Sequence, residues 1–547
     1  KMYRDLCLFA LFYALYVTII FMHRSVTDTF YAEESLRDIF VHEEFVKEDA
    51  PNMMKTFMDI GEVEEFWQWT LGPFVNGVSQ KNKLEQGYIL RYYRILGSVR
   101  VRQLRVRDDS CDITSAFVPF YTSTGCYGFY ADDTKETSPY GPAANETMPG
   151  EPVDDSLNPC AKEGVAPGFC YQETDSPWIY GRVAEWYDGG GYLVDLSYNA
   201  DLAREQLSAL RDAEWVDLQT SAVVMTVNAL NIHVGLFTNM VFVIEFTPGG
   251  GFVNSYNFRS FPSSLYNTNI DMLRFGLEIV WAVMLVIWVA YDIYQLIEVK
   301  VNHGSILTWF VRPWWNFLDV INKIVFLVTS IWYVLFVIDL QKFVAGINNL
   351  NQDTNFTEVE ELGYQWTFMF NIVAVNLIIS TFTVFKYLNV NPRMSMMWKT
   401  LEKASPDLAA FLVFFGIIFI TFVASGYLMF GSQLENFRTF TKATFACFNM
   451  LLGDFQYDVM EREGNKFYAP LYFTIFMLLV TFILVNVFLA IVQDAYVIVQ
   501  MKYANRPTLA VALRRWVNKQ SGKVRSYIGK TALSQEYEAA GAQISDK

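Results

Sequence analysis

Residues Phe440 to Asp454 read FTKATFACFNMLLGD, an apolar run that ends in Leu-Gly-Asp. An α-helix needs about 20 apolar residues to cross the hydrocarbon core of a bilayer, so this run is too short to span one. Longer apolar runs flank it, Leu408 to Phe430 before it and Tyr468 to Val492 after it. Membranes tolerate a short helix at this depth only where it lines a water-filled cavity. The stretch therefore predicts a re-entrant helix between two transmembrane helices.

Four further apolar runs have the length of a transmembrane helix, and they cover Leu6 to Met22, Phe275 to Ile297, Phe317 to Ile338 and Phe368 to Leu388. The first run is also compatible with a signal peptide, but it is rich in aromatic residues and no small-residue cleavage site follows it. Of all residues, 52% are hydrophobic and only 18% are charged, compared with about 25% charged in soluble domains. We therefore expect a predominantly α-helical membrane protein with six transmembrane helices and a re-entrant helix, a voltage-gated-channel-like arrangement.

The segment between the first and second spans is polar and has the size of a domain. Strand-like alternation of apolar and polar residues occurs in Val99 to Val106 and in Met240 to Phe246, and helical periodicity occurs in Ala200 to Arg211. Pro and Gly residues mark turns throughout. We expect a large α+β domain here, which we call the outer domain.

The outer domain contains Cys111, Cys126, Cys160 and Cys170, whereas Cys7 and Cys447 lie in apolar runs. Clustered cysteines without zinc-type spacing indicate disulfides in an oxidising compartment. Four cysteines allow three pairings. We expect the local one, which joins Cys111 to Cys126 and Cys160 to Cys170.

Two kinds of signal predict which loops lie on each side of the membrane. The glycosylation sequons at Asn145 and Asn355 fall on one side if the six spans alternate. The basic residues of the short loops fall on the other side, and they are Lys300, Arg312, Arg393, Lys399 and Lys403. Because cytoplasmic loops are rich in Lys and Arg, we expect an extracellular or lumenal outer domain that is glycosylated at Asn145 and Asn355.

These runs divide the chain into six segments. They are the first transmembrane helix (1–23), the outer domain (24–266), helices two to four (267–390), a cytoplasmic linker (391–405), a pore domain with helix five, the re-entrant helix and helix six (406–503), and a basic cytoplasmic tail (504–547). From Lys502 to Lys530 the chain carries basic residues and no acidic one. We expect this tail to contact anionic lipid headgroups and not nucleic acid.

Six spans with a re-entrant helix before the last are typical of cation channels, in which four copies enclose one pore. At the end of the short helix, Leu452, Gly453 and Asp454 have the position of a selectivity filter. Four Asp454 carboxylates in a ring would attract permeant cations such as Ca²⁺, Na⁺ and K⁺. The alternative is that Gly-Asp forms an ordinary turn.

On the sixth span, Phe482, Asn486, Leu489 and Gln493 fall on one helical stripe. Two amides on a membrane helix are unfavourable in contact with lipid, so the stripe is a candidate pore lining. Leu489, Gln493 and Asn486 are the candidate gate residues, because a narrow apolar ring gates by dewetting. The alternative is a face that packs against another helix through hydrogen bonds.

The fourth span carries a single basic residue, Lys386, where voltage sensors carry several. One charge that crosses 100 mV contributes about 2.3 kcal/mol, so we expect weak voltage dependence at most. On the third span Asp319 and Lys323 lie four residues apart and are expected to pair, with Lys386 as a further possible neighbour. We interpret the pair as structural first, and the alternative to a sensor role for Lys386 is that its side chain reaches the lipid headgroups.

No catalytic constellation is evident in the sequence. The chain has only four His, and its Gly triplets are not followed by the GK[ST] of a phosphate loop. We expect neither an enzyme nor a bound cofactor, and the only metal we expect is a permeant cation at Asp454.

Six strings give the chain a specific resemblance to the polycystin family of transient receptor potential channels, and within it to the polycystin-2 group. They are GSVRVRQLRVRDDSC (97–111), YDGGGYLVDLS (187–197), NALNIHVGLFTNMVFVIEF (228–246), WWNFLDVINKIV (314–325), LLGDFQY (451–457) and LVNVFLAIVQDAY (484–496). The resemblance implies a homotetrameric, non-selective, calcium-permeable cation channel whose outer domains interlock above the pore. It also implies residence in cilia, flagella or the endoplasmic reticulum, and a possible polycystin-1-like partner.

The chain departs from the family pattern at two places. Thr383 stands where the family usually has a second Lys on the fourth span, and Gln493 stands where the gate often has Asn. Three alternative functions remain. A mucolipin-like channel shares the layout, a receptor subunit in a hetero-complex would not need the LLGD filter, and a transporter would show inverted repeats, which are not evident here.

Overall fold

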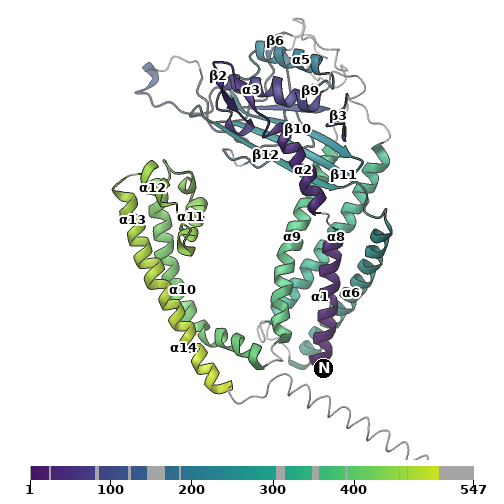
Figure 1. Ribbon diagram of the computed structural model, residues 1–547, viewed down its shortest axis with the longest axis vertical. Helices are drawn as coiled ribbons and strands as arrows, with labels where there is room; N and C mark the ends of the chain where they lie inside the picture. The colour runs from purple at the N-terminus through teal and green to yellow at the C-terminus, as the bar shows by residue number, and fades with distance from the viewer. Residues whose placement is uncertain are drawn as a thin grey trace, which may run out of the picture. The chain divides into compact units, whose positions relative to one another are not determined.

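The computed structural model describes residues 2–23, 26–79, 86–120, 125–143, 167–183, 186–303, 315–347, 357–388, 392–454, 456–464 and 466–503 of the 547-residue chain. These residues form two compact units (Figure 1). The first is Ala10–Ser380, and the second is the part after Ser380 together with the N-terminal residues up to Phe9. Each unit is described by itself below.

Six segments of the described chain are long and apolar enough to cross a membrane, which confirms the six expected spans. Their helices are longer than the apolar runs that predicted them. They are α1 (Met2–His23), α6 (Asn269–His303), α8 (Trp315–Gly346), α9 (Thr357–Leu388), α10 (Pro392–Phe430) and the continuous α13 (Tyr468–Phe476), η7 (Met477–Leu484) and α14 (Val485–Tyr503). The predicted linker is helical from Pro392 onward and runs directly into the fifth span.

The outer domain is built on one antiparallel sheet of eight strands. Along the sheet the order is β12-β11-β10-β5-β9-β8, and β4 pairs with both β10 and β3. The bounds are β3 (Tyr88–Ile89), β4 (Tyr93–Ile95), β5 (Val99–Arg105), β8 (Tyr171–Gln172), β9 (Gly191–Leu196), β10 (Thr220–Asn231), β11 (Leu236–Phe246) and β12 (Phe252–Pro262). The predicted strands at Val99 and Met240 are parts of β5 and β11.

Short helices cover one face of this sheet. They are α2 (Val26–Phe40), η1 (Phe57–Asp59), α3 (Val63–Trp69), η2 (Thr70–Phe74), α4 (Val75–Val78) and α5 (Ala200–Asp212). Their apolar side chains and the facing strand residues form the largest core cluster among the described residues. Figure 1 shows α3 and α5 on the side of the sheet away from the transmembrane helices of this unit. Two further two-stranded sheets, β1 (Phe45–Lys47) with β2 (Ala50–Lys55) and β6 (Tyr140–Ala143) with β7 (Pro167–Phe169), also belong to the domain, as does η3 (Val118–Phe120).

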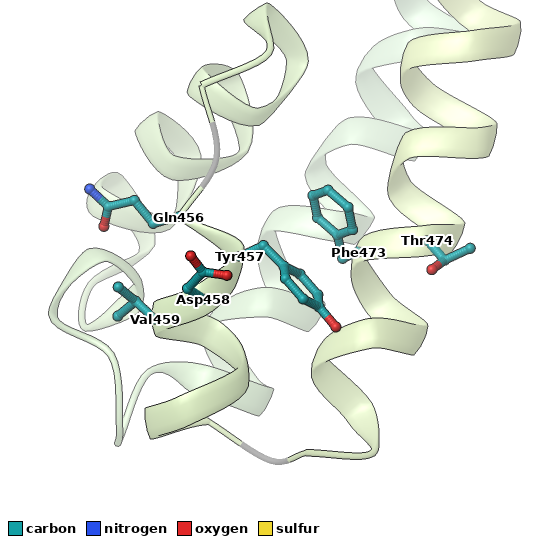
Figure 2. Close-up of a pocket in the computed structure, with 6 residues that line it drawn as sticks. All are labelled: Gln456, Tyr457, Asp458, Val459, Phe473 and Thr474. Carbon is teal, nitrogen blue, oxygen red and sulfur yellow. The ribbon is translucent and has the colours of Figure 1, made fainter.

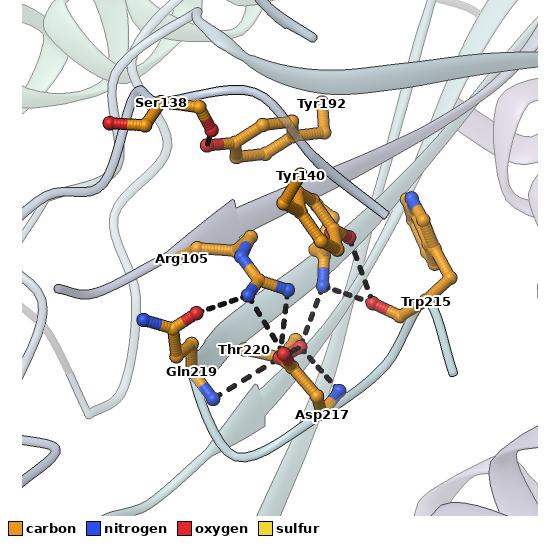
Figure 3. A network of polar contacts seen from close by, with 9 residues as sticks. Arg105, Ser138, Tyr140, Tyr192, Trp215, Asp217, Gln219 and Thr220 are labelled. Atoms are coloured by element: carbon orange, nitrogen blue, oxygen red, sulfur yellow. Dashed lines mark hydrogen bonds and ion pairs between the residues drawn. The ribbon is translucent and has the colours of Figure 1, made fainter. Parts of the chain in front are cut away.

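A buried network around Arg105 holds the segment that leads into β6 against the sheet (Figure 3). The Arg105 guanidinium makes two hydrogen bonds of 2.8 and 2.7 Å to the Asp217 carboxylate, and its carbon lies 3.6 Å from the centre of the Tyr140 ring. Tyr140 donates a hydrogen bond to the Trp215 carbonyl at 3.0 Å, and Tyr192 donates one to the Ser138 carbonyl at 2.7 Å. Burial raises the pKa of Tyr140, so these phenols stay protonated and donate.

The cysteines follow the expected local pairing as far as the described residues extend. Cys111 and Cys126 form a disulfide with a Cα–Cα distance of 5.3 Å. Cys170 is also disulfide-bonded, and its expected partner Cys160 lies outside the described residues. Among the described cysteines, Cys7 and Cys447 are free thiols. The sequons at Asn145 and Asn355 and the basic tail also lie outside the described residues, so these predictions stay predictions.

Within the first unit, the outer domain is docked on the outer ends of α8 and α9. A buried apolar cluster joins strand residues such as Phe237 and Phe261 to helix residues such as Phe336 and Phe343. The rings of Phe237 and Phe343 are 5.5 Å apart. Arg259 of β12 lies over the Tyr364 ring of α9 at 5.6 Å. This edge of the sheet and these helices therefore share one apolar cluster.

Candidate functional site

The re-entrant helix predicted from the sequence is α11 (Phe440–Leu452). The Thr439 side chain caps its start by accepting a hydrogen bond from the Lys442 N–H at 3.2 Å, preceded by the short turn η6 (Glu435–Phe437). One face of the helix buries Ala443, Cys447 and Met450 in a core shared with α10 and α13. The run is too short to span a membrane, and its apolar face packs between the last two spans.

The end of α11 places the candidate filter residues beyond the helix. Gly453 has a φ of +92°, in the left-handed region that favours glycine. Its N–H bonds to the Met450 carbonyl at 3.1 Å, and the Asp454 N–H bonds to the Asn449 carbonyl at 2.9 Å, which together form a Schellman cap. The cap turns the chain sharply and leaves Leu452, Gly453 and Asp454 exposed in the single chain. The Gly-Asp pair therefore forms an ordinary helix-ending turn, and this turn lies at the position predicted for the filter.

A second short helix, α12 (Tyr457–Glu463), follows the candidate filter and was not predicted. It carries Asp458, Glu461 and Glu463. Its first turn borders a pocket of about 740 Å³ that is also lined by Phe473 and Thr474 of α13 (Figure 2). The Tyr457 and Phe473 rings lie 5.1 Å apart beside it. The Gly464 that ends the helix is the one sequence signal that would have indicated α12.

The predicted stripe on the sixth span lies on an uncovered side of the helix. Phe482, Asn486, Leu489 and Gln493 are all exposed in the single chain. The nearly opposite side, with Leu484, Ala495 and Val499, is buried. Phe488 contacts Phe411 of α10 with ring centres 6.4 Å apart. The stripe therefore points away from the fifth helix of its own chain.

Two details of this helix escaped the sequence analysis. Met477–Leu484 form a π-helical segment, η7, which contains Phe482, the first residue of the stripe. The Asn486 side chain donates one hydrogen bond to the Phe482 carbonyl one turn earlier, so one of its two N–H groups has a partner within its own helix. π-helical segments are frequent at functional sites.

The predicted pair on the third span is confirmed and gains a third member. Lys323 Nζ lies 3.4 Å from an Asp319 carboxylate oxygen, and it also pairs with Asp292 of α6. Lys323 lies 5.3 Å from the centre of the Trp288 ring. The neighbouring Asn322 accepts a hydrogen bond of 2.9 Å from the Ser380 hydroxyl of α9. Asp292 is one of the few carboxylates in the apolar run of α6, and its rarity there is the sequence signal that could have indicated a paired residue.

Lys386 lies in the last turn of α9. Thr383, which lies one turn earlier, is buried. Lys386 belongs to the second compact unit and the Asp319–Lys323 pair to the first. The predicted contact between them therefore stays a prediction.

The described residues contain no group of three or more His, Cys, Asp or Glu side chains arranged to hold a metal ion. One chain offers a single carboxylate, Asp454, at the end of α11. A multi-carboxylate cation site at this position would need Asp454 from further copies of the chain.

Comparisons with known proteins cover almost the whole described region. Residues 56–263 match the family model described as Polycystin domain, and residues 265–499 match the model described as Polycystin cation channel. Human "Polycystin-2-like protein 1" is 29% identical over 478 residues, which cover 86% of this chain and 55% of that protein. Zebrafish (Danio rerio) "Polycystin-2" is 27% identical over 481 residues, which cover 86% of this chain and 49% of that protein.

More distant similarity extends to other animals and to larger proteins. Caenorhabditis elegans "Polycystin-2" is 23% identical over 526 residues, which cover 94% of this chain and 67% of that protein. Mouse "Polycystin family receptor for egg jelly" is 23% identical over 471 residues, or 84% of this chain but only 21% of that protein. The chain spans about half the length of the human and zebrafish relatives.

Proposed function

Because the chain belongs to the polycystin cation channel family, we propose that four copies form a cation-selective pore that conducts Na⁺, K⁺ and Ca²⁺. Leu452, Gly453 and Asp454 line its filter, and Asn486, Leu489 and Gln493 line its gate. The observation that carries the proposal is the Schellman cap at Gly453, which ends a re-entrant helix and presents the Asp454 carboxylate beyond it.

The uncovered faces of the second unit support assembly with further copies. On α11, the side opposite the buried residues carries Phe445, Phe448 and Leu452, which are 64%, 48% and 71% exposed. On the sixth span the exposed stripe mixes apolar residues with the amides Asn486 and Gln493. Lipid covers an apolar face well, but amides are unfavourable in hydrocarbon. A ring of four copies covers the first face with a neighbouring subunit and gives the second face to water.

Electrostatics favour cations at such a ring. At 4 Å, a carboxylate attracts a monovalent cation by about 1 kcal/mol in bulk water and by about 4 kcal/mol at an effective dielectric constant of 20. Several carboxylates around one ion add to this attraction, and a divalent ion doubles it, against the cost of lost hydration. The acidic residues of α12 lie further along the chain and act more weakly, as a vestibule that salt screens.

Voltage contributes little to the proposed gating. If Lys386 alone moved through the full membrane field in each of four subunits, 100 mV would supply roughly 9 kcal/mol. A residue in the last turn of its helix crosses only a small part of that field. We therefore propose a weakly voltage-dependent channel that opens at Leu489, where wetting of an apolar ring permits conduction.

The name of one relative favours a second role. The name of the mouse egg-jelly relative describes a receptor, and this chain aligns to a small part of that larger protein. We propose that the chain also assembles with a larger, polycystin-1-like relative, and that it resides in ciliary or flagellar membranes or the endoplasmic reticulum. Anionic lipids are the proposed partners of the basic tail.

Single-channel recording of the purified protein in planar bilayers tests the proposal directly. We expect unitary currents that reverse at the cation equilibrium potential in a salt gradient. The mass of the detergent-solubilised complex should correspond to four chains of 63.1 kDa. A monomeric or dimeric complex without unitary currents would refute the pore, whereas currents that reverse at the anion potential would refute its selectivity.

A further inference from the structure

Tyr472 of α13 lies where the fifth span, the re-entrant helix and the sixth span meet. Its side chain is 5% exposed. Its hydroxyl donates a hydrogen bond to the backbone carbonyl of Phe422 on α10 at 2.8 Å, and its oxygen lies 3.3 Å from the Cys447 sulfur on α11. One oxygen atom therefore contacts both of the other elements.

The direction of these two bonds follows from the number of protons. A phenol has one proton to donate, and the Phe422 carbonyl is only an acceptor, so that proton goes to the carbonyl. The Cys447 thiol must then donate to the phenol oxygen. The hydroxyl of Tyr472 is a bridge between the backbone of the fifth helix and the middle of the re-entrant helix.

Apolar packing holds the Tyr472 ring in place. Its centre lies 5.8, 5.4 and 6.4 Å from the ring centres of Phe422, Phe430 and Phe476. Gly426 of α10 makes the room, because a Cβ there would lie 2.7 Å from the Tyr472 hydroxyl oxygen. The fifth helix lacks a side chain at the place where this hydroxyl reaches it.

The link from this bridge to the filter is short and stiff. α11 runs without a break from Cys447 to Leu452, and the cap at Gly453 ties Asp454 back to Asn449. A displacement of α11 at Cys447 therefore displaces Asp454. Since a functional group must be held within about 0.5 Å to act well, the seat of α11 matters to the filter.

We propose that Tyr472 is a positioning residue for the filter, and that its bridge between Phe422 and Cys447 sets the preference of the pore among permeant cations. This inference rests on the proposed function of Asp454. It assigns a selectivity role to a side chain that is buried and does not line the pore.

The test compares reversal potentials of full-length channels in solutions with Na⁺ on one side and Ca²⁺ on the other. Tyr472→Phe keeps the ring and removes only the bridging oxygen. We expect the ratio of Ca²⁺ to Na⁺ permeability to fall by about two- to fivefold, since one neutral hydrogen bond biases an equilibrium by about fivefold. Tyr427→Phe, which removes an exposed hydroxyl from α10, should leave the ratio unchanged.

A second variant and a second readout separate positioning from a general loss of folding. Cys447→Ala breaks the same bridge from α11 and should shift the ratio in the same direction, so it carries the test alone if Tyr472→Phe does not reach the surface. In a Cys7→Ser background, the buried Cys447 thiol should react slowly with a small methanethiosulfonate. It should react faster when Tyr472→Phe is added, because α11 is less firmly seated.

Asp454→Asn serves as the reference for the filter itself. If Asp454→Asn changes the permeability ratio while Tyr472→Phe and Cys447→Ala keep the wild-type ratio, the positioning role is wrong and the filter assignment stands. If the ratio changes without faster Cys447 modification, α11 has not moved and the positioning role is also wrong. If Asp454→Asn has no effect, the filter assignment fails and the positioning role fails with it.

Discussion

At the scale of single residues, the buried charge cluster of the first unit makes a sharp prediction. Lys323 lies between Asp292 and Asp319 in the helical bundle. Removal of one partner from a buried ion pair costs about 3–5 kcal/mol, because the remaining charge loses its counterion. We expect Lys323→Met to reduce surface expression severely. Expression should recover in part when Asp292→Asn and Asp319→Asn are added, and measurement of surface protein by biotinylation checks both outcomes. A triple variant that is expressed no better than Lys323→Met would show that the cation is needed for another reason.

A second buried charge predicts how acid destabilises the outer domain. Burial of Glu65 raises the pKa of its carboxyl, but hydrogen bonds from Lys55, Gly61 and Lys47 outweigh this and lower the pKa to about 2. The Lys55 and Lys47 Nζ atoms lie 2.6 and 2.9 Å from the carboxylate. Because the folded pKa lies below the unfolded value near 4.3, Glu65 contributes about 3 kcal/mol above that pH, and this stability is lost as pH falls toward 2.

The substitution Glu65→Gln tests this assignment in thermal unfolding of the full-length protein. We expect a loss of about 2–3 kcal/mol at pH 7 and a shallower decline of stability between about pH 4 and 2. Glu62→Gln is the matched control, since Glu62 also pairs with Lys47 but its side chain is 60% exposed, and it should change little. Equal effects of the two substitutions would contradict the buried role of Glu65.

Sequence patterns predicted local pairs at this scale but not distant ones. Asp319 and Lys323 are four residues apart on one helix, so the helical period alone brings them together. Asp292 is 31 residues from Lys323 and on another helix, and only the rotation of α6 against α8 decides that they meet. Gly453 and Asp454 were singled out because they follow a short apolar helix, and the positive φ of Gly453 agrees with the glycine preference of helix ends.

At the scale of elements, the exposed stripe of the sixth span predicts the position of the gate. Leu489 is 54% exposed in the single chain, and an apolar ring of four such residues would exclude water when narrow. Leu489→Asn should wet the ring and raise the resting open probability several-fold in single-channel records. Val487→Asn, an exposed position away from the stripe on the same helix, is the matched control. If both substitutions raise resting current equally, the constriction lies elsewhere.

The disulfide in the outer domain predicts a stability effect. Cys111 and Cys126 are 15 residues apart in sequence, and closing such a loop stabilises a fold by about 3 kcal/mol in the chain-entropy model. Cys111→Ser should lower the unfolding temperature and weaken tetramer assembly, as measured by size-exclusion chromatography with light scattering. An unchanged tetramer fraction and melting temperature would show that the loop is held by its other contacts.

The long apolar helices were predicted, whereas polar elements and the apolar strand β10 were missed. α11 stood out because thirteen residues of FTKATFACFNMLL are too apolar for a loop and too few for a span. α12 was missed because YDVMERE has no apolar stripe. β12 was missed because Asn254, Ser255 and Asn257 interrupt its pattern, and the strand exists because it pairs along its whole length with β11.

At the scale of the whole molecule, the sequence predicted the outer domain, the order of spans and an assembly of four copies, but not how the outer domain packs on the spans. The sheet of the outer domain and the ends of α8 and α9 share a core, which no local pattern specifies. The number of copies and the diameter of a pore depend on contacts between chains. The uncovered faces of α11 and α14 and the family support an assembly of several copies. The number of copies has to be measured.

The most direct measurement is the reversal potential of Asp454→Asn channels in mixed Na⁺ and Ca²⁺ solutions. The substitution keeps the size of the side chain and removes its charge from each subunit, so Ca²⁺ loses several kcal/mol of attraction where Na⁺ loses about half as much. We predict a several-fold lower ratio of Ca²⁺ to Na⁺ permeability and weaker block by Ca²⁺, while Glu461→Gln on α12 changes both only slightly. If Asp454→Asn leaves the permeability ratio and the block at wild-type values while Glu461→Gln alters them, Asp454 does not form the filter.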